Sequence, residues 1–446
     1  MARTKRNPPL RVLLNGRDVG MLARASSGAI DFQYAQEWLE WDNAIPVSLS
    51  LPLREDRYIG APVLAVLENL LPDNKAIRDR VAAKVQASGT DAYSLLSKIG
   101  ADCVGALQFL PDNADVGKTG TIEGRPISDK EIAEKIADLK SSPLGMDEND
   151  DFRISIAGAQ EKTALLYHEG KWQVPLGTTP TTHIIKPQIG QIPNGIDLSN
   201  SVENEYLCMK LCKAFGLDVA NVEIVDFAGT KALAVERFDR IWTRDGRLLR
   251  RPQEDMCQAL SVPPNLKYQA DGGPDNQAIM QLLKGSDKPQ DDQLAYLKAQ
   301  LIFWLLGATD GHAKNFSVFL TPGMRYTLTP LYDILTAQPS IDSNQVSTKK
   351  FKLAMSVGDN NHYKISDITP RHFIQTADRC KFDQSKLIAE LEQLLALGEK
   401  TAQSTISGLA HKLPDQLTDS VLARIVARIR SISLWPQNQG KSDTQS

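Results

Sequence analysis

The sequence has no long apolar run and little cysteine, and neither charge is in large excess. No uninterrupted apolar stretch approaches the roughly 18 residues that cross a membrane, and the most apolar run, residues 301–308, is far shorter. The basic residues 1–6 are not followed by the apolar segment of a secretory signal. We therefore expect a chain that neither spans a membrane nor is exported.

Cysteine and charge exclude two further classes. Five scattered cysteines in 446 residues do not form a disulfide framework, which indicates a reducing compartment such as the cytoplasm. Cys208 and Cys212, four residues apart, lack a second pair at zinc-site spacing and are predicted to be packed helix residues. A net charge of -3 gives no global attraction to nucleic acid or membrane, although a local basic patch remains possible.

The N-terminal third is predicted to be a mixed α/β module. Asn15 and Gly16 form a favoured hairpin turn between apolar segments. Residues 113–151 are rich in loops and end in an acidic stretch at 147–151, a plausible boundary. The expected elements are strands at 10–14, 19–22 and 104–110 and helices at 65–71, 92–99 and 130–139.

The rest of the chain has strand signals first and helix signals later. Gly216 and Gly307 stand where helix C-terminal glycines are expected. Strands are expected at 163–167, 182–185, 222–226 and 232–235, and helices at 201–214, 291–306, 385–397 and 417–432. Around a connector at 236–239, this order predicts an α+β, two-lobed, protein-kinase-like fold with a mainly helical C-terminal lobe. The expected segments are 1–150, an N-terminal module of the N-lobe, 151–238, the N-lobe core, 239–436, the helical C-lobe, and 437–446, a disordered tail.

Asp310 and Asn315 carry the sharpest chemical signal. They are separated by four residues directly after an apolar helix, which is the spacing of kinase catalytic loops. There the Asp faces the substrate hydroxyl and the Asn turns toward a magnesium ion. Alone, the pair could also be polar capping residues in a helix-terminal turn. Asp333, inside an apolar segment, favours the kinase interpretation because a buried carboxylate needs a partner or a metal, although a turn Asp is the alternative.

Two segments upstream fit nucleotide binding. Lys186 ends an apolar strand, as does the kinase lysine that contacts the α- and β-phosphates, and Glu205 on the next helix could pair with it. Residues 154–163 form a small-residue loop that could cradle phosphates through backbone N–H groups. It is not a Walker A loop, because Glu161 precedes Lys162, and an ordinary β-turn is the alternative.

The connector and the charges after it complete the pattern. Backbone groups of Glu236 and Phe238 are expected to recognise adenine, so their side chains are uninformative. The charged residues at 250–257 could order the catalytic loop or meet substrate, but a solvated salt-bridge cluster is the more frequent arrangement.

Taken together, these segments in this order resemble the HipA family of toxin kinases over most of the chain. The resemblance implies that Asp310 is the catalytic base and that His312 contacts phosphate or orients Asp310. Asn315 and Asp333 would hold Mg2+, and Lys186 would contact the ATP phosphates. Ser155 would be the residue that the kinase phosphorylates on itself, which would expel the loop and inactivate it. The loop over the nucleotide would comprise Ala157, Gly158, Ala159, Gln160, Glu161 and Lys162.

The resemblance also implies partners. These are the dimeric helix-turn-helix antitoxin HipB, operator DNA bound through the complex, and an aminoacyl-tRNA synthetase substrate, notably glutamyl-tRNA synthetase. The basic residues 3–6 or 349–352 could touch DNA, although a solvated surface is the default. Two other functions stay open: a small-molecule or lipid kinase on the same scaffold, and a catalytically idle co-repressor.

Overall fold

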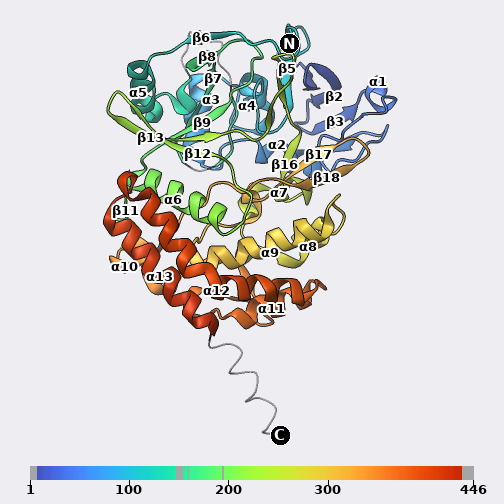
Figure 1. Ribbon diagram of the computed structural model, residues 1–446. Coiled ribbons are helices and arrows are strands. Elements are labelled where there is room, and N and C mark those ends of the chain that lie inside the picture. The colour runs from blue at the N-terminus through green and yellow to red at the C-terminus, as the bar shows by residue number, and fades with distance from the viewer. Residues whose placement is uncertain (1–7, 147–153, 159, 193–194, 434–446) are drawn as a thin grey trace. The chain divides into compact units, whose positions relative to one another are not determined.

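The computed structural model describes residues 8–146, 154–158, 160–192 and 195–433 (Figure 1). The chain folds into two compact units, each built from separate segments. The units do not follow the expected boundaries after residues 150 and 238: residues 188–220 belong to unit 2 and 239–266 to unit 1. The expected functional segments stay a prediction. Unit 1 comprises Met1–Pro187, Asn221–Leu266 and Ser317–Tyr326, and unit 2 comprises Gln188–Ala220, Lys267–Phe316 and Thr327–Ser446.

A five-stranded antiparallel sheet begins unit 1. Its order is β4-β3-β2-β1-β5, and the predicted hairpin turn is present, with Asn15 and Gly16 both at positive φ. The strand predicted from 104 starts later because Gly105 has a φ of 74°, which is not a strand conformation. The position requires glycine, since a Cβ there would lie 2.5 Å from the Gln253 carbonyl oxygen. The elements are β1 (Leu10–Leu14), β2 (Arg17–Arg24), β3 (Ile30–Tyr34), β4 (Tyr58–Ile59), β5 (Leu107–Pro111), α1 (Gln36–Leu39), α2 (Ala61–Asn69), α3 (Lys75–Lys84) and α4 (Ala92–Ile99).

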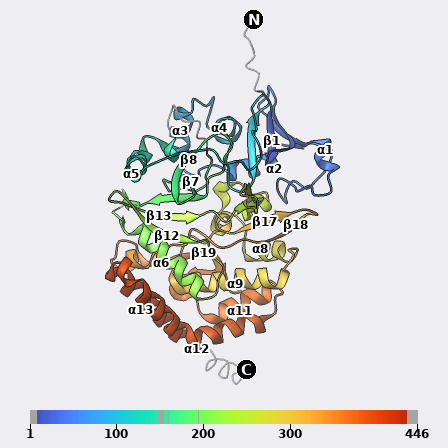
Figure 2. The ribbon, with the colours of Figure 1, turned by 45° about the horizontal axis from the view of Figure 1, so that its top comes forward.

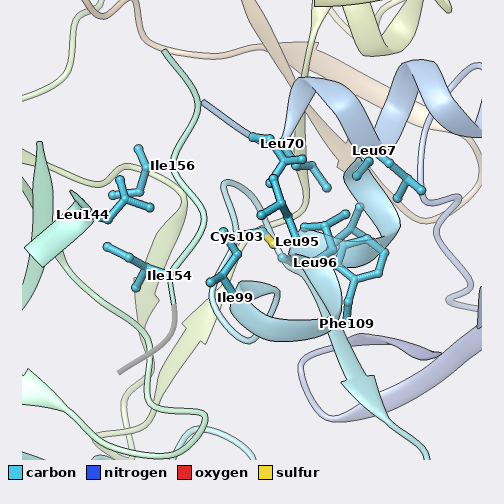
Figure 3. Close-up of a cluster of buried hydrophobic side chains, with 14 of the residues drawn as sticks. Leu67, Leu70, Leu95, Leu96, Ile99, Cys103, Phe109, Leu144, Ile154 and Ile156 are labelled. Atoms are coloured by element: carbon cyan, nitrogen blue, oxygen red, sulfur yellow. The ribbon is translucent and has the colours of Figure 1, made fainter. Parts of the chain in front are cut away.

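A six-stranded sheet forms the rest of the scaffold of unit 1, in the order β12-β13-β9-β7-β8-β6. One apolar core extends from the first sheet and its helices to the segment before β7, where Figure 3 shows Ile154 and Ile156 beside Leu144. The elements are β6 (Gly124–Pro126), α5 (Asp129–Ala137), β7 (Thr163–His168), β8 (Lys171–Pro175), β9 (His183–Pro187), β12 (Val222–Phe227) and β13 (Thr230–Glu236). Shorter elements follow: β14 (Arg240–Trp242), β15 (Leu248–Arg250), β16 (Gln253–Asp255), α7 (Met256–Ala259), β17 (Ser317–Thr321) and β18 (Arg325–Leu328).

Unit 2 is mainly helical, as expected for the later part of the chain (Figure 2). Its long helix α9 contacts α11, α12 and α13. The helix predicted at 385–397 continues to 409, where Ala402 and Ile406 prolong the buried stripe. Gly398 admits α13 closely, since a Cβ there would lie 2.8 Å from Ile429. The elements are β10 (Gly190–Gln191), β11 (Asp197–Leu198), α6 (Ser201–Ala214), α8 (Asn276–Leu283), α9 (Pro289–Leu306), α10 (Gln338–Asp342), β19 (Lys352–Val357), β20 (His362–Lys364), α11 (Pro370–Arg379), α12 (Gln384–Leu409) and α13 (Asp415–Ser433).

Three sequence interpretations of helices have clear outcomes. Gly216 and Gly307 follow α6 and α9 with φ of 84° and 73°, the left-handed conformation that glycine adopts without strain. Cys208 and Cys212 are buried, unbridged residues of α6. No helix in the described ranges is both long and apolar enough to cross a bilayer. The predicted tail at 437–446 and the acidic boundary at 147–151 lie outside the described residues.

Candidate functional site

In unit 2, the structure brings the Asp310 segment and the Asp333 segment side by side. Ala308 forms an antiparallel bridge with Thr336, and the Ala337 N–H donates to the Gly307 carbonyl at 3.1 Å. The Thr336 hydroxyl also donates to the Leu306 carbonyl at 2.6 Å. Because these bonds flank both segments, two carboxylates 23 positions apart in sequence are held on neighbouring strands of chain.

Asp310 is the accessible carboxylate of this site. Its side chain is 55% exposed, and its Oδ1 accepts a hydrogen bond from the Tyr268 hydroxyl and lies 3.8 Å from His312 Nε2. The Tyr268 and His312 rings meet edge to face, with centroids 4.8 Å apart. Tyr268 was missed by the sequence reasoning because it lies 42 positions upstream in a loop, where no motif marks it. The arrangement orients a carboxylate while leaving it open to a substrate hydroxyl.

Asn315 is buried and turned by the same loop. Its Nδ2 donates to the Asp310 carbonyl at 2.7 Å, so Oδ1 is the side-chain atom that could bind a cation. Tyr332, next to Asp333, donates its hydroxyl to the Lys314 carbonyl at 2.8 Å. The neighbours of the two predicted metal residues are therefore bonded to each other. Asp333 has a φ of 59°, a left-handed conformation that costs a non-glycine residue on the order of 1 kcal/mol or more and is often found at functional sites.

These residues fit Mg2+ better than zinc. Asn315 and Asp333 offer oxygen atoms only, and the described part of the chain contains no cluster of three or more His, Cys, Asp or Glu suited to a metal. Magnesium commonly takes one or two carboxylates and completes its shell with substrate phosphates and water. A site with few protein ligands is compatible with a metal that a nucleotide also binds.

Two helices hold the segments from outside. On α6, Asn204 donates to the Thr336 carbonyl at 2.8 Å and accepts from its N–H at 2.9 Å. On α13, Arg428 donates to the Leu305 carbonyl at 2.9 Å and to Gln338 Oε1 at 2.6 Å. Burial lowers the pKa of Arg428 to about 10, which still leaves it charged at neutral pH. Arg428 thus ties the residues before the Asp310 segment to those after the Asp333 segment.

In unit 1, Ser155 occupies an enclosed position. Its side chain is fully buried, and its hydroxyl donates to the Leu70 carbonyl at 2.6 Å. Its N–H donates to the Asp102 carbonyl at 2.9 Å. Further along, Gly158 has a φ of 112°, and its carbonyl accepts from the Asp73 N–H at 3.1 Å. Ala159 lies outside the described residues.

The predicted nucleotide loop folds back toward the predicted phosphate lysine. Gln160 Nε2 donates to the carbonyl of Pro187, the residue after Lys186, at 3.0 Å. The buried Lys162 donates to the Ala157 carbonyl at 2.8 Å. Glu161 pairs with Arg80 of α3. Lys186 itself is buried on β9, opposite Leu233 of β13. Unit 1 therefore gathers the loop and the lysine at one end of β9.

The predicted hinge lies at the end of β13, also in unit 1. Glu236 is exposed, and its carboxylate accepts from Asn221 at 2.9 Å. The half-buried Phe238 ring packs edge to face on Phe319, with centroids 5.8 Å apart. Both side chains have partners of their own, and the expectation that only backbone groups would meet a base stays a prediction.

The expectation of a solvated charge cluster at 250–257 was wrong. Arg250, Glu254 and Asp255 are all buried. Arg250 pairs with Asp102 at 2.9 Å, whereas Glu254 accepts from the Ser48 hydroxyl at 2.5 Å and the Leu49 N–H at 2.7 Å. Burial raises the pKa of Glu254 to about 8, although both donors act in the opposite direction. Long-range packing, which the local sequence does not report, buries these side chains.

Comparison with known proteins agrees with the geometry. Residues 154–412 match the family model of the HipA-like C-terminal domain, and residues 10–110 match that of the HipA N-terminal domain. The chain is 35% identical to a protein named putative kinase Y4mE from Sinorhizobium fredii, over 78% of this chain and 80% of the relative. It is 31% identical to the serine/threonine-protein kinase toxin HipA of Shewanella oneidensis, over 75% of each chain.

A solved structure extends the likeness to the fold. The Shewanella oneidensis HipA structure, a complex with HipB and its operator DNA, superposes with a TM-score of 0.78 at 27% identity. The match covers 95% of this chain and 98% of that one. It confirms the predicted α+β fold of a HipA kinase, with its mixed N-terminal module and mainly helical later part. The chain belongs to the HipA family of toxin kinases.

Proposed function

We propose that the protein is an ATP- and Mg2+-dependent serine/threonine kinase, the toxin of a toxin–antitoxin module. The observation that carries the proposal is the pairing of the Asp310 and Asp333 segments in unit 2 through bonds at Gly307, Ala308 and Thr336. This pairing supports a reacting carboxylate beside a metal-binding one, which phosphoryl transfer requires.

In the proposed reaction, Asp310 orients the substrate hydroxyl and accepts its proton as the oxygen attacks the γ-phosphoryl group. Tyr268 and His312 hold the carboxylate in place. Asn315 and Asp333 would hold Mg2+, which when bound neutralises charge on the phosphates. Lys186 adds positive charge toward the α- and β-phosphates, and backbone N–H groups of residues 157–162 contact them.

Ser155 is the proposed site of self-phosphorylation. Its hydroxyl is buried against the Leu70 carbonyl, so this segment has to move away from Leu70 and become exposed before the serine can react. A phosphate adds about -1.5 to -2 charge at neutral pH, and the Leu70 carbonyl oxygen that the Ser155 hydroxyl contacts would repel it. The modified segment could therefore not return, and the loop that follows it would be lost from the nucleotide.

The proposed partners follow from the relatives. The Shewanella oneidensis HipA was solved with HipB and operator DNA, and we propose that this chain also acts in the cytoplasm with a HipB-type antitoxin as a co-repressor. Lys349, Lys350 and Lys352 are exposed and could reach DNA phosphates. The proposed substrate is an aminoacyl-tRNA synthetase, notably glutamyl-tRNA synthetase. A small-molecule kinase and a catalytically idle co-repressor are the competing functions.

The test is the intact mass of the purified protein after incubation with Mg2+ and ATP. We expect one phosphate on wild type, located at Ser155 by peptide mapping, and none on Ser155→Ala or Asp310→Asn. The starting material is first treated with a phosphatase while partly unfolded and then refolded, so that a prior modification cannot hide the result. Binding of ATP without any transfer, to Ser155 or to a synthetase, would favour the small-molecule kinase. Absence of ATP binding would favour the idle co-repressor.

A further inference from the structure

Unit 1 contains a buried cluster of ionised side chains that the proposed reaction does not use. The side chains of its five charged members are only 2–5% exposed. Burying charge is costly unless each group is paired and hydrogen-bonded, so such a cluster persists only where its geometry is well satisfied. The members are Asp102, Arg237, Asp239, Arg240 and Arg250, with the buried hydroxyl of Thr181 between them.

The Asp102 carboxylate is the centre of this cluster. Its Oδ1 accepts from Arg240 Nη2 at 2.8 Å and from Arg250 Nε at 2.9 Å. Its Oδ2 accepts from the Thr181 hydroxyl at 2.8 Å and lies 3.4 Å from Arg237 Nη1. Burial alone would raise the pKa of Asp102, but the three guanidinium groups outweigh it and hold that pKa well below its usual range.

These arginines fix the backbone of the predicted hinge. Arg237 and Asp239 flank Phe238, and Asp239 accepts from Arg237 at 3.0 and 2.8 Å. Asp239 also accepts from the Gly105 N–H at 2.7 Å. Arg240 donates to the Gly105 carbonyl at 2.9 Å. The residues on both sides of Phe238 are therefore anchored to the segment that contains Asp102, in the N-terminal module.

The main chain of Asp102 holds the other proposed nucleotide segment. Its carbonyl accepts from the Ser155 N–H at 2.9 Å, and Asp102 pairs with Ile154 as a parallel bridge. Asp102 thus contacts the hinge through its side chain and, through its backbone, the Ser155 segment that precedes the 157–162 loop. A shift of Asp102 would displace both the hinge and the Ser155 segment, since its peptide group and its carboxylate move together.

We infer that Asp102 is a positioning residue, which sets the hinge through Arg237 and Arg240 and joins it to the Ser155 segment. The inference rests on the proposed function and adds a role for the N-terminal module, namely that it adjusts nucleotide binding. Asp102 itself is not placed on the nucleotide, so it acts only through the residues that it holds.

The test uses adenosine, which would contact the hinge but has no phosphates for Lys186 or the loop. Adenosine affinity of the full chain is measured by calorimetry for wild type, Asp102→Asn and Thr181→Val. The Thr181→Val variant keeps the shape and every charge, and so covers the case that Asp102→Asn does not fold. Asp18→Asn, which removes the exposed pair with Arg11 in the same unit, is the matched control.

We expect adenosine affinity to fall about 3- to 30-fold in both cluster variants and to stay unchanged in the control. Amide hydrogen exchange at residues 154–158 should also become faster in the cluster variants, whereas exchange in β1 and β2 should not. A lower melting temperature with unchanged adenosine affinity in the folded protein would reduce Asp102 to a structural role and overturn the inference. Weaker adenosine binding with unchanged exchange at 154–158 would overturn the joint role. If wild type binds neither adenosine nor ATP, the proposed function itself fails and this inference with it.

Discussion

The Asp102 cluster of unit 1 and the Asp310 segment of unit 2 surround their carboxylates in opposite ways. In unit 1, the Asp102 side chain is 5% exposed and meets three guanidinium groups. In unit 2, the Asp310 side chain is 55% exposed, accepts a hydrogen bond from the Tyr268 phenol and lies 3.8 Å from a histidine. A carboxylate surrounded by fixed cations is stabilised as an anion and is a poor base, whereas an exposed carboxylate can be reached by another molecule. The difference separates a charge that shapes the fold from one that we propose to react.

Glu254 is a third case between the two. It is as buried as Asp102, but its described partners are a hydroxyl and an amide N–H from the Ser48 segment. Without a cation to offset burial, its pKa rises to about 8, whereas the pKa of Asp102 falls. Burial raises both pKa values, and only at Asp102 do charged partners outweigh it, so burial alone does not set the ionisation of a carboxylate in this molecule.

The largest expected effect is on Asp310. Asp310→Asn should lower phosphate transfer by about 10²- to 10⁴-fold, the usual contribution of a general base, because the amide cannot take the proton. Its melting temperature should change by no more than a degree or two, since the side chain is exposed. Transfer is measured with radiolabelled ATP and stability by calorimetry, with Asp367→Asn as an exposed control in the same unit. Retained transfer in the folded variant would contradict the role of Asp310.

The second effect is expected at Asp102, where the substitution should change stability strongly, whereas Asp310→Asn should leave stability nearly unchanged. Asp102→Asn should cost unit 1 about 3–5 kcal/mol of stability, because it leaves the three buried guanidinium groups of the cluster with Asp239 as the cluster's remaining carboxylate. Since the folded pKa of Asp102 is depressed, its stabilisation is present above the unfolded pKa of about 4 and is lost as pH falls below it. Denaturant unfolding at pH 7 and pH 3 should give a smaller difference for Asp102→Asn than for wild type. Equal pH dependence in both proteins would break the comparison with Asp310.

The third effect concerns Glu254 and has the opposite pH sign. Its raised pKa means that stability is highest when the carboxyl is protonated and falls as pH rises from about 4 toward 8. Each unit of pKa is worth about 1.4 kcal/mol, so a rise from 4.5 to about 8 gives an expected loss on the order of 5 kcal/mol. Glu254→Gln should remove this slope in urea titrations at pH 5 to 9, and exposed Glu134→Gln should not. An unchanged slope would show that Glu254 is ionised throughout.

The smallest effect is expected at Arg428 of α13. Arg428→Met removes the link between the Leu305 carbonyl and Gln338, and we expect turnover to fall about 3- to 10-fold and the Mg2+ requirement to rise. The ATP affinity measured without Mg2+ should not change. Arg430→Met, also on α13, is the control, because it removes an exposed pair with Glu399 of α12. Loss of thermal stability with normal turnover would leave Arg428 a packing residue.

Local sequence was sufficient where an element depends on its own residues. The strand at 10–14 and the helices at 92–99 and 201–214 appear with the predicted bounds, since apolar spacing and turn residues determine them within a few positions. Asp310 and Asn315 were proposed for the same reason, because their spacing along one loop is itself the signal, and Asp333 was proposed because it stands inside an apolar segment. Their chemical roles stay predictions that the experiments above test.

Tertiary structure decided which charges are buried and which segments meet. Nothing in the sequence around Arg250 or Glu254 distinguishes them from a solvated cluster, yet contacts with residues about 150 and 200 positions away bury both. Tyr268 reaches Asp310 across 42 positions, and Asp102 reaches Arg237 across 135. The sequence by itself determined several of the elements and the candidate chemistry, because those signals are local. The partners that set each pKa depend on long-range packing, and so only the fold could supply them.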